Sequence, residues 1–189
     1  MKEETKRNIV IGGSILLAAG VVTVGVLILR RTLRTIPKGV DPVRPFKLDK
    51  FMGKWYEIAR TDNRFEKGLK NVTIEFTRNS NKTISVLHKG DNPKKEKSHE
   101  EKGRIAIVDK PNVGKMKISF RRPLYSGYNV IEIDPDYRYA LVVGDDLKQL
   151  WLLSRRPDML DEVALQYLAI ARSYGYNTSN IVWVDQDEY

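Results

Sequence analysis

The chain has 189 residues, 41% of them hydrophobic, which suffices for one domain with a core plus an additional segment. It contains no cysteine, which excludes disulfides, thiolate metal sites and thiol lipidation. The formal net charge is +9, but residues 1–45 hold eight basic and three acidic side chains and so account for +5 of it. This excess flanks an apolar run, where basic residues meet phospholipid headgroups, and the distribution therefore argues against nucleic-acid binding.

Ile9 to Leu29 form a run of 21 residues without a charged side chain. As a helix, this run would reach about 30 Å, the thickness of a bilayer core, and three arginines follow it closely. A cleaved signal peptide is the alternative, with residues 18–20 as the cleavage site, but cleavage there would leave an apolar mature end. We predict that residues 1–34 are an uncleaved signal anchor, a transmembrane helix with basic flanks. Basic residues are similar in number on both sides, so the orientation stays open.

The next segment, residues 35–47, contains three prolines and a glycine and cannot continue a helix. We predict that it is a short, semi-rigid tether. The pattern then changes to strand-like segments, and residues 48–189 are predicted to form a separate domain.

Eight strand candidates follow at near-regular spacing, separated by turn residues, which is typical of an antiparallel barrel or sandwich. Alternation is clear in Val72, Ile74 and Phe76, whose neighbours are polar, so these three side chains are expected on one face. The charged stretch 91–101 is expected to be a solvated hairpin tip. The predicted strands are 54–61, 71–78, 83–89, 102–109, 115–121, 127–134, 137–144 and 149–154.

A helix is predicted after the eighth strand, over residues 159–174. Apolar residues recur there at helical spacing, Pro157 and Asp158 precede the segment as a start signal, and Gly175 follows it as a stop. The strand before it is apolar on both faces, so we expect the helix to cover its outer face. Residues 181–184 are predicted to form a short final strand.

Two separated motifs carry a family resemblance. Gly53, Trp55 and the following Tyr-Glu-Ile-Ala-Arg open the first strand, and a Leu-Trp-Leu-Leu-Ser-Arg segment ends at Arg155. This combination resembles the lipocalin family over roughly residues 46–185. The likeness is to the bacterial outer-membrane lipocalins, with their animal apolipoprotein D-like and plant relatives. It implies an all-β, eight-stranded up-and-down antiparallel barrel with a C-terminal helix.

The resemblance also implies structural roles at the closed end of the barrel. There the indole of Trp55 would plug the barrel and Arg155 would lie across it, a stacking that suits a planar guanidinium. Arg156 next door keeps the choice of arginine open. Asp136 and Tyr137 match the second family motif, a Thr-Asp-Tyr turn, although this chain has Pro135 in place of the Thr. The 62–70 connection corresponds to the family loop that lies over the open mouth.

Aromatic and aliphatic side chains in the strands are candidate pocket walls, since an eight-stranded barrel is just wide enough to be packed solid or to hold one small ligand. Tyr128 and Asn129 lie in a Gly-Tyr-Asn-Val segment close to that of the bacterial relatives, and they are candidates for contact with a ligand headgroup. The full set of expected ligand-binding residues is Phe76, Ile118, Phe120, Tyr128, Asn129, Tyr139, Leu141 and Trp151.

The sequence predicts neither a catalytic residue nor a metal site or cofactor. His88 and His99 are interpreted as too few and too far apart to hold a metal. Glu57 lies two residues after Trp55 and is expected to point inward. It is interpreted as a hydrogen-bonded barrel residue, because no paired acid or nucleophile that would make it a general base is evident.

The resemblance implies a binding protein and not an enzyme. Its expected function is to bind and store or transport a hydrophobic ligand, a fatty acid or lysophospholipid, at a membrane surface. The barrel would lie outside the cytoplasm, in the bacterial cell envelope. Two alternatives stay open: a lipocalin-fold enzyme acting on a lipid or isoprenoid, and a structural envelope protein whose barrel is packed shut. The sequence leaves the oligomeric state undetermined.

Overall fold

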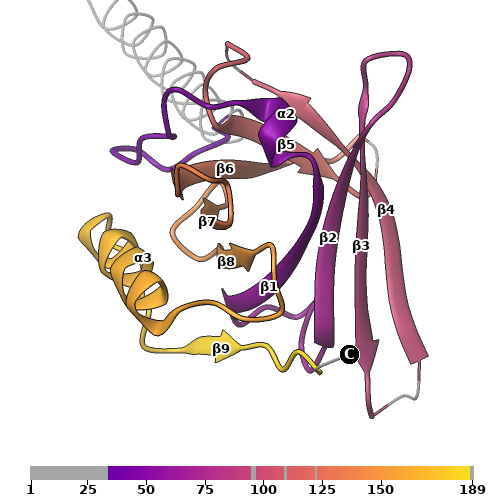
Figure 1. The fold of residues 1–189 in the computed structure, drawn as a ribbon, viewed down its shortest axis with the longest axis vertical. Coiled ribbons are helices and arrows are strands. Elements are labelled where there is room, and N and C mark those ends of the chain that lie inside the picture. Colours follow the sequence, from indigo (N-terminus) through magenta and orange to yellow (C-terminus); the bar gives the residue numbers. More distant parts are fainter. Residues whose placement is uncertain (1–33, 95–96, 109, 122, 188–189) are drawn as a thin grey trace, which may run out of the picture. The chain divides into compact units, whose positions relative to one another are not determined.

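The computed structural model describes residues 34–94, 97–108, 110–121 and 123–187. Within these residues, eight antiparallel strands follow one another around a barrel, which closes because β1 pairs with both β2 and β8 (Figure 1). The predicted eight-stranded barrel with a C-terminal helix and a short final strand is therefore confirmed. The strands are β1 (Gly53–Thr61), β2 (Lys70–Arg78), β3 (Ile84–Asn92), β4 (Lys97–Ile107), β5 (Lys115–Ser119), β6 (Ser126–Ile133), β7 (Tyr139–Val143) and β8 (Leu150–Ser154).

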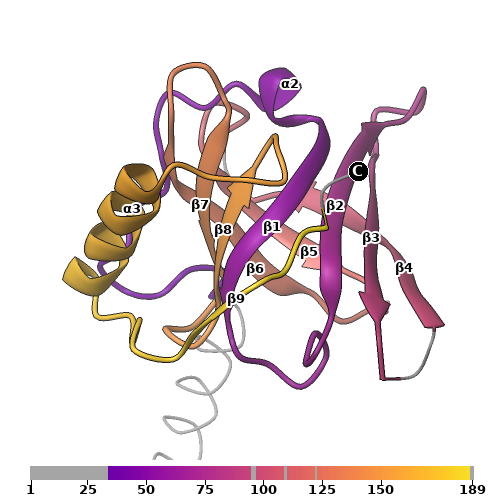
Figure 2. The same cartoon turned by 60° about the horizontal axis from the view of Figure 1, so that its bottom comes forward.

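A helix, α3 (Asp161–Ser173), covers the outer face of the barrel beside β7 and β8 (Figure 2). It buries four side chains at helical spacing, Ala164, Tyr167, Leu168 and Ala171, against apolar residues of β1, β6, β7 and β8. This contact explains why β7 and β8 are apolar on both faces: one face lines the barrel and the other lies beneath the helix. A short strand, β9 (Ile181–Trp183), then pairs antiparallel with β1.

One end of the barrel is filled by aromatic side chains. The short helix α2 (Leu48–Phe51) precedes β1 and places Phe51 inside the barrel, where its ring lies 5.0 Å from that of Trp55 and 5.2 Å from that of Phe76. Phe46 adds a further ring, 5.4 Å from that of Phe51. Burial of several large rings supplies much of the apolar contact that stabilises this end.

Residues 35–47 are packed on the barrel, which corrects the prediction of a tether. The amide of Val43 donates to Val130 O at 2.9 Å, and the amide of Gly114 donates to Val43 O at 3.1 Å. A Cβ on Gly127 would lie 2.1 Å from Thr35 O, so this glycine permits the close approach. The prolines of the segment do exclude a helix, as expected, but backbone bonds to β6 and its neighbours fix the chain in place.

The hairpin between β3 and β4 is longer than predicted. Paired strand runs out to Asn92 and resumes at Lys97, so most of the stretch expected to be a solvated tip is ladder. Opposite charges face one another across it, with Lys89 Nζ 3.2 Å from Glu100 Oε2. A highly charged segment forms strand here because cross-strand pairs of opposite charge are compatible with a solvent-exposed ladder.

The predicted membrane anchor over residues 1–34 lies outside the described residues except for Arg34. Among the residues that the structure describes, none of the helices has both the length and the apolar character needed to cross a bilayer. Residues 35–189 form a compact unit of their own.

Candidate functional site

The closed end brings Trp55 and Arg155 together. Trp55 is fully buried, and its indole nitrogen donates to Phe51 O at 2.8 Å. The guanidinium carbon of Arg155 lies 3.8 Å from the centre of the Trp55 ring, within the range of a cation–π contact. The neighbouring Arg156 points away, is exposed and pairs with Asp158 at 3.1 Å. The structure therefore assigns the stacking position to Arg155.

Arg155 also binds four backbone carbonyls of the closed end. Its guanidinium donates to Lys54 O and Lys50 O at 2.7 Å each and to Met52 O at 2.9 Å. Its Nε donates to Tyr137 O at 3.2 Å. One side chain thus ties the segment before β1, the start of β1 and the β6–β7 turn together.

Gly53 stands where this network needs an unusual backbone. Its φ is +91°, a conformation that L-residues with a side chain rarely adopt, and an added Cβ would lie 3.5 Å from Arg155 Nη1. The glycine two residues before Trp55 thus serves the turn from α2 into β1.

The second motif is held differently from the expectation. Tyr137 adopts φ +60° and its hydroxyl accepts a hydrogen bond from the amide of Lys47 at 2.7 Å. Asp136 is exposed, and the carboxylate that organises the turn belongs to Asp134, which accepts from the amides of Arg138 and Tyr139 at 2.6 Å each. Because Pro135 replaces the family Thr, the side chain that accepts from the turn amides belongs to the preceding residue, Asp134. An Asp at the start of a turn is a known signal for this arrangement.

The other end of the barrel contains an open pocket of about 480 Å³. Three of the expected wall residues line it: Ile118, Phe120 and Trp151. Phe76 and Tyr128 lie deeper, in the buried interior cluster, with the Tyr128 ring 5.7 Å from Phe76 and 6.0 Å from Trp151. Burial, followed by the nearby acidic side chains, raises the pKa of the Tyr128 hydroxyl well above its ordinary value. The pocket therefore rests on a packed aromatic floor.

The remaining three expected ligand residues are not in the pocket, and we correct their placement. Tyr139 and Leu141 pack in the cluster beneath α3, because β7 directs Ala140 and Val142 into the barrel instead. Asn129 is buried on the outer side, where its amide donates to Val143 O and Gly144 O at 3.3 Å each and also to Thr35 O. Both faces of these strands are buried, so apolar and polar residues do not alternate along them. The sequence therefore did not indicate which side chains face the pocket.

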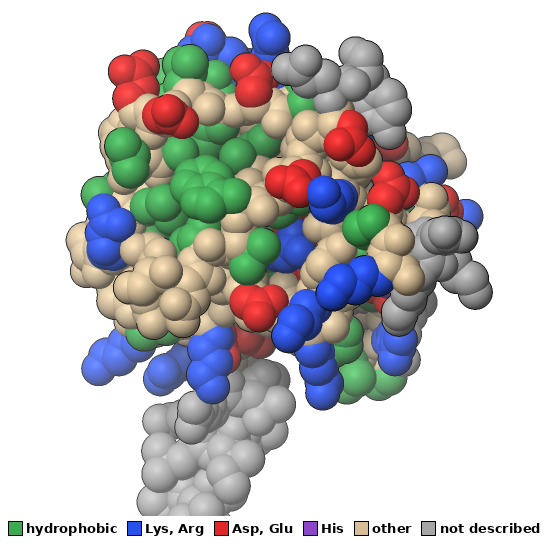
Figure 3. Space-filling view, turned by 90° about the horizontal axis from the view of Figure 1, so that it is seen from below, with side chains coloured by type: hydrophobic (Ala, Val, Ile, Leu, Met, Phe, Trp, Pro, Cys, Tyr) green, Lys and Arg blue, Asp and Glu red, His purple; other side chains and the backbone are tan. Residues whose placement is uncertain are grey.

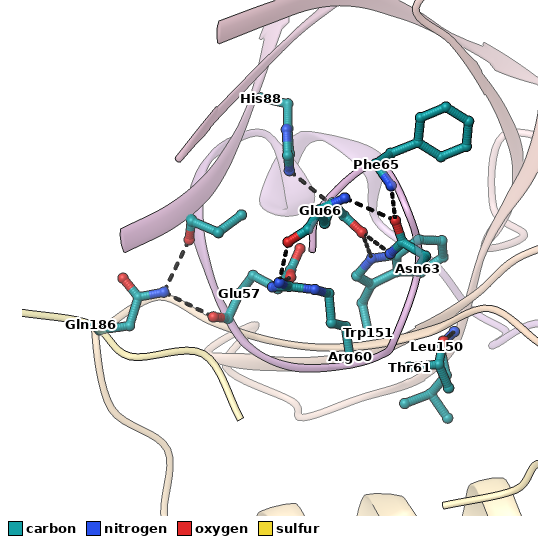
Figure 4. Close-up of polar contacts among 11 residues, drawn as sticks. Glu57, Arg60, Thr61, Asn63, Phe65, Glu66, His88, Leu150, Trp151 and Gln186 are labelled. Carbon is teal, nitrogen blue, oxygen red and sulfur yellow. Dashed lines mark hydrogen bonds and ion pairs between the residues drawn. The ribbon is translucent and has the colours of Figure 1, made fainter. Parts of the chain in front are cut away.

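A buried polar cluster lies at the mouth between the barrel wall and the 62–69 loop (Figure 4). Arg60 Nη1 donates to Glu57 Oε1 at 2.7 Å, and both side chains are almost fully buried. Arg60 also donates to the carbonyl of Glu66 in the loop. Glu66 Oε1 lies 3.2 Å from His88 Nε2, while its Oε2 accepts from Asn63 and, at 3.4 Å, from the Trp151 indole.

The two carboxylates of this cluster have opposite pKa shifts. Burial, with the nearby negative charge of Glu66, raises the pKa of Glu57 well above its ordinary value despite the contact with Arg60. Burial would raise the pKa of Glu66 too, but its polar contacts with His88 and Asn63 outweigh that effect and lower it. Glu57 is inward-facing and hydrogen-bonded, which agrees with its interpretation as a barrel residue.

Sequence reasoning missed Arg60, Asn63 and Glu66 as members of this site. A β-bulge between Glu57 and Ala59 places both Glu57 and Arg60 inside the barrel, against simple alternation. The separation of His88 and His99 was also judged wrongly: β3 and β4 bring their rings to within 6.0 Å. The only available signal was a pair of charged residues in an otherwise apolar strand.

The rim of the pocket combines apolar and cationic side chains. Phe65 and Leu124 both line it and are 68% and 73% exposed, and Arg64 and Arg121 line it beside them. Such a rim suits a ligand with an apolar body and an anionic end. A separate group of hydrophobic surface side chains, with charged side chains around it, is seen from below the view of Figure 1, on the side where α3 lies (Figure 3).

The barrel is closed, plugged at one end and open at the other to a pocket with apolar walls. These features place it in the class of β-barrels that hold one small ligand. The profile of the lipocalin-like domain matches residues 46–186. The chain belongs to the lipocalin family.

Similar proteins agree with this assignment. The chain is 41% identical over 172 residues to "Outer membrane lipoprotein Blc" of Citrobacter freundii, covering 91% of this chain and 97% of that protein. It is 40% identical over 164 residues to the protein of the same name from Escherichia coli (strain K12), covering 87% and 93%. The fold is shared with Per a 4, a major allergen from cockroaches, at a TM-score of 0.65 and 20% identity over 82% of this chain and 96% of that one.

Family membership supports the binding of a hydrophobic ligand. The names of the bacterial relatives support a membrane-anchored protein of the cell envelope.

Proposed function

We propose that the chain binds a single-chain lipid, a fatty acid or lysophospholipid, in the mouth pocket and stores or carries it at the membrane surface. The observation that carries this proposal is the pocket itself: about 480 Å³, open at the barrel mouth, with apolar walls and with Arg64 and Arg121 beside Glu101 at the rim. This volume lies within the usual range for small-ligand sites. An open pocket also favours binding over the alternative of a barrel that is packed shut.

The distribution of polarity suggests how the lipid lies. Ile118, Phe120 and Trp151 offer the acyl chain an apolar wall, whereas Arg64 and Arg121 offer its anionic end two cations at the rim. The headgroup would therefore stay at the mouth, where both a carboxylate and a phosphate find partners. Because the interior beneath is filled by the aromatic cluster, the acyl chain would occupy the outer half of the barrel.

The energetics of this arrangement are adequate. Each buried CH₂ contributes roughly 0.8 kcal/mol, so burying about fifteen of them yields roughly 12 kcal/mol before the rim contacts are added. With an association cost at the lower end of the range of about 4–15 kcal/mol, roughly 8 kcal/mol remains, which corresponds to an affinity near the micromolar range. Rim charges then contribute to specificity and to the rate of association.

The test uses the full chain, delipidated and held in amphipol, titrated with fatty acids and lysophospholipids of about 14 to 20 carbons. We expect saturable one-to-one binding that Phe120→Asp weakens by about tenfold or more, because it places a charge in the apolar wall. Leu165→Asp is the matched control, since Leu165 is 62% exposed on α3 and lies outside the pocket. Absence of binding to every lipid, or equal loss in the two variants, would reject the proposal.

We also propose that residues 1–34 anchor the protein as an uncleaved transmembrane helix, with the barrel outside the cytoplasm. The uncharged run from Ile9 to Leu29 and the absence of a lipidation cysteine support this reading. The full chain should stay in the membrane pellet after alkaline carbonate extraction, and a variant lacking residues 9–29 should be released. Intact-mass measurement of a shortened N-terminus would reject the uncleaved anchor.

A further inference from the structure

The polar cluster at the barrel mouth contains three metal-ligating groups from separate parts of the fold. Glu57 comes from β1, His88 from β3 and Glu66 from the loop between β1 and β2. One donor atom of each lies within 4.8 Å of the other two, and the residues are buried or half-buried. We propose that these three side chains form a binding site for a divalent transition metal of the zinc type.

The orientation of the donors supports the site. Glu66 Oε1 and His88 Nε2 face one another at 3.2 Å. Bonds of about 2.0–2.2 Å to a tetrahedral Zn²⁺ place neighbouring donors roughly 3.4 Å apart, so this pair already has the spacing of two ligands on one ion. The third donor, from Glu57, lies within 4.8 Å of the other two and needs to approach by at most about 1.4 Å, a movement within the reach of a carboxylate side chain.

His88 supplies the second observation. Its side chain is 7% exposed, and, among the residues that the structure describes, Nε2 has no partner in hydrogen-bonding geometry, although Glu66 Oε1 lies 3.2 Å from it. A buried imidazole nitrogen without such a partner is unfavourable unless something else satisfies it. A metal ion between the imidazole and the carboxylate would provide that partner.

Polar neighbours hold the two carboxylates in place. Asn63 and the Trp151 indole both donate to Glu66 Oε2, which leaves Oε1 directed at His88. Arg60 donates to Glu57 Oε1, and a carboxylate can bind a metal through its other oxygen. Such outer contacts fix the orientation of metal ligands.

The charge and the access of the site also suit a cation. Two carboxylates and one guanidinium leave an excess of one negative charge when all are ionised, in a region where unpaired charge is costly. Glu66 and His88 line the mouth pocket, so an ion reaches them from solvent and keeps an open coordination position toward the pocket. The site does not depend on a lipid being bound.

The test measures Zn²⁺ binding to the chelator-treated, lipid-free full chain, without a histidine tag, by competition with a chromophoric chelator. We expect one ion per chain with micromolar or tighter affinity. His88→Gln and Glu66→Gln should each weaken binding by about tenfold or more, because each removes one ligand while keeping the side-chain size. Far-UV and near-UV circular dichroism establish that the variants are folded.

His99→Gln is the matched control. His99 lines the same pocket next to His88, but it lies on β4, about one-third exposed, and outside the three-donor cluster. This variant should bind Zn²⁺ as the parent chain does. Absence of stoichiometric binding, unchanged binding in His88→Gln, or a greater loss in His99→Gln would overturn the proposal, the last by placing the ion at the rim pair of His99 and Glu101.

Discussion

Replacing Arg155 by methionine tests the physical role of the closed-end plug. Methionine replaces the apolar stem of the arginine but lacks the guanidinium. Four hydrogen bonds to backbone carbonyls and the stacking on Trp55 are lost together. The carbonyls belong to the segment before β1, to β1 and to the β6–β7 turn, so the variant uncouples three parts of the chain at once.

The expected loss of stability depends on how well water can replace each of the four hydrogen bonds of Arg155. The bonds to Lys54 O and Lys50 O are exposed, and water takes them over at little net loss. Those to Met52 O and Tyr137 O are partly buried and contribute about 1.5 kcal/mol each, as charged donors do. The cation–π contact adds about 1 kcal/mol. We expect a loss of about 4 kcal/mol and a fall in Tm of about 8–16 °C for a domain of this size.

Urea unfolding followed by tryptophan fluorescence measures this loss, with Arg156→Met as the matched control. Arg156 is 80% exposed and its pair with Asp158 is equally open to solvent, so its replacement should change the free energy of unfolding by less than about 0.5 kcal/mol. A double-mutant cycle with Trp55→Phe should show coupling of about 1 kcal/mol. A loss below about 1 kcal/mol for Arg155→Met, or equal losses at the two arginines, would refute the reasoning.

Two further predictions concern single carboxylates. The pKa of Glu66 is lower in the folded chain than its unfolded value near 4.5, so ionised Glu66 stabilises the fold above pH 4.5. This contribution is lost as the pH falls through the folded pKa. Glu66→Gln should therefore lower stability in urea unfolding by about 1–2 kcal/mol at pH 7 and progressively less below pH 4.5. The control Glu75→Gln, at an exposed position of β2, should change stability by less than about 0.5 kcal/mol at pH 7. Asp134→Ala removes the acceptor of three turn amides and should cost about 2 kcal/mol. Asp136→Ala should cost less than about 0.5 kcal/mol, and the opposite ranking in the same assay would contradict the assignment of the turn to Asp134.

The barrel was predictable because its strands carry local signals. Turn residues separate apolar segments of strand length, and the helical spacing of Ala164, Tyr167, Leu168 and Ala171 identifies the covering helix. The plug was predictable from a resemblance, since nothing in composition joins Trp55 to a residue a hundred positions later. The packed course of residues 35–47 was not predictable, because its contacts are backbone bonds to β6 and its neighbours that leave no pattern in its own side chains.

The pocket was only half predictable, for a reason that lies in the strands themselves. The sequence shows which side chains face inward only where the other face of a strand meets water. In β5, for example, Met116 and Ile118 point inward and lysines alternate with them. In β7 every residue after Tyr139 is buried, so alternation is absent and the assignment of Leu141 to the pocket failed. A bulge in β1 has a similar effect, because it places Glu57 and Arg60 on the same side of the sheet.

The two ends of the barrel therefore differ in how they respond to sequence change. At the closed end, Arg155 binds backbone carbonyls, which every residue provides, so the surrounding side chains can vary while the plug persists. At the mouth, the side chain of Arg60 pairs with that of Glu57, and the Glu66 carboxylate faces the His88 imidazole, so a change in one residue leaves a buried polar partner without its contact. Variation that alters the ligand is thus expected on the apolar wall and exposed rim, at positions such as Phe120 and Phe65, which lie beside the polar cluster without belonging to it.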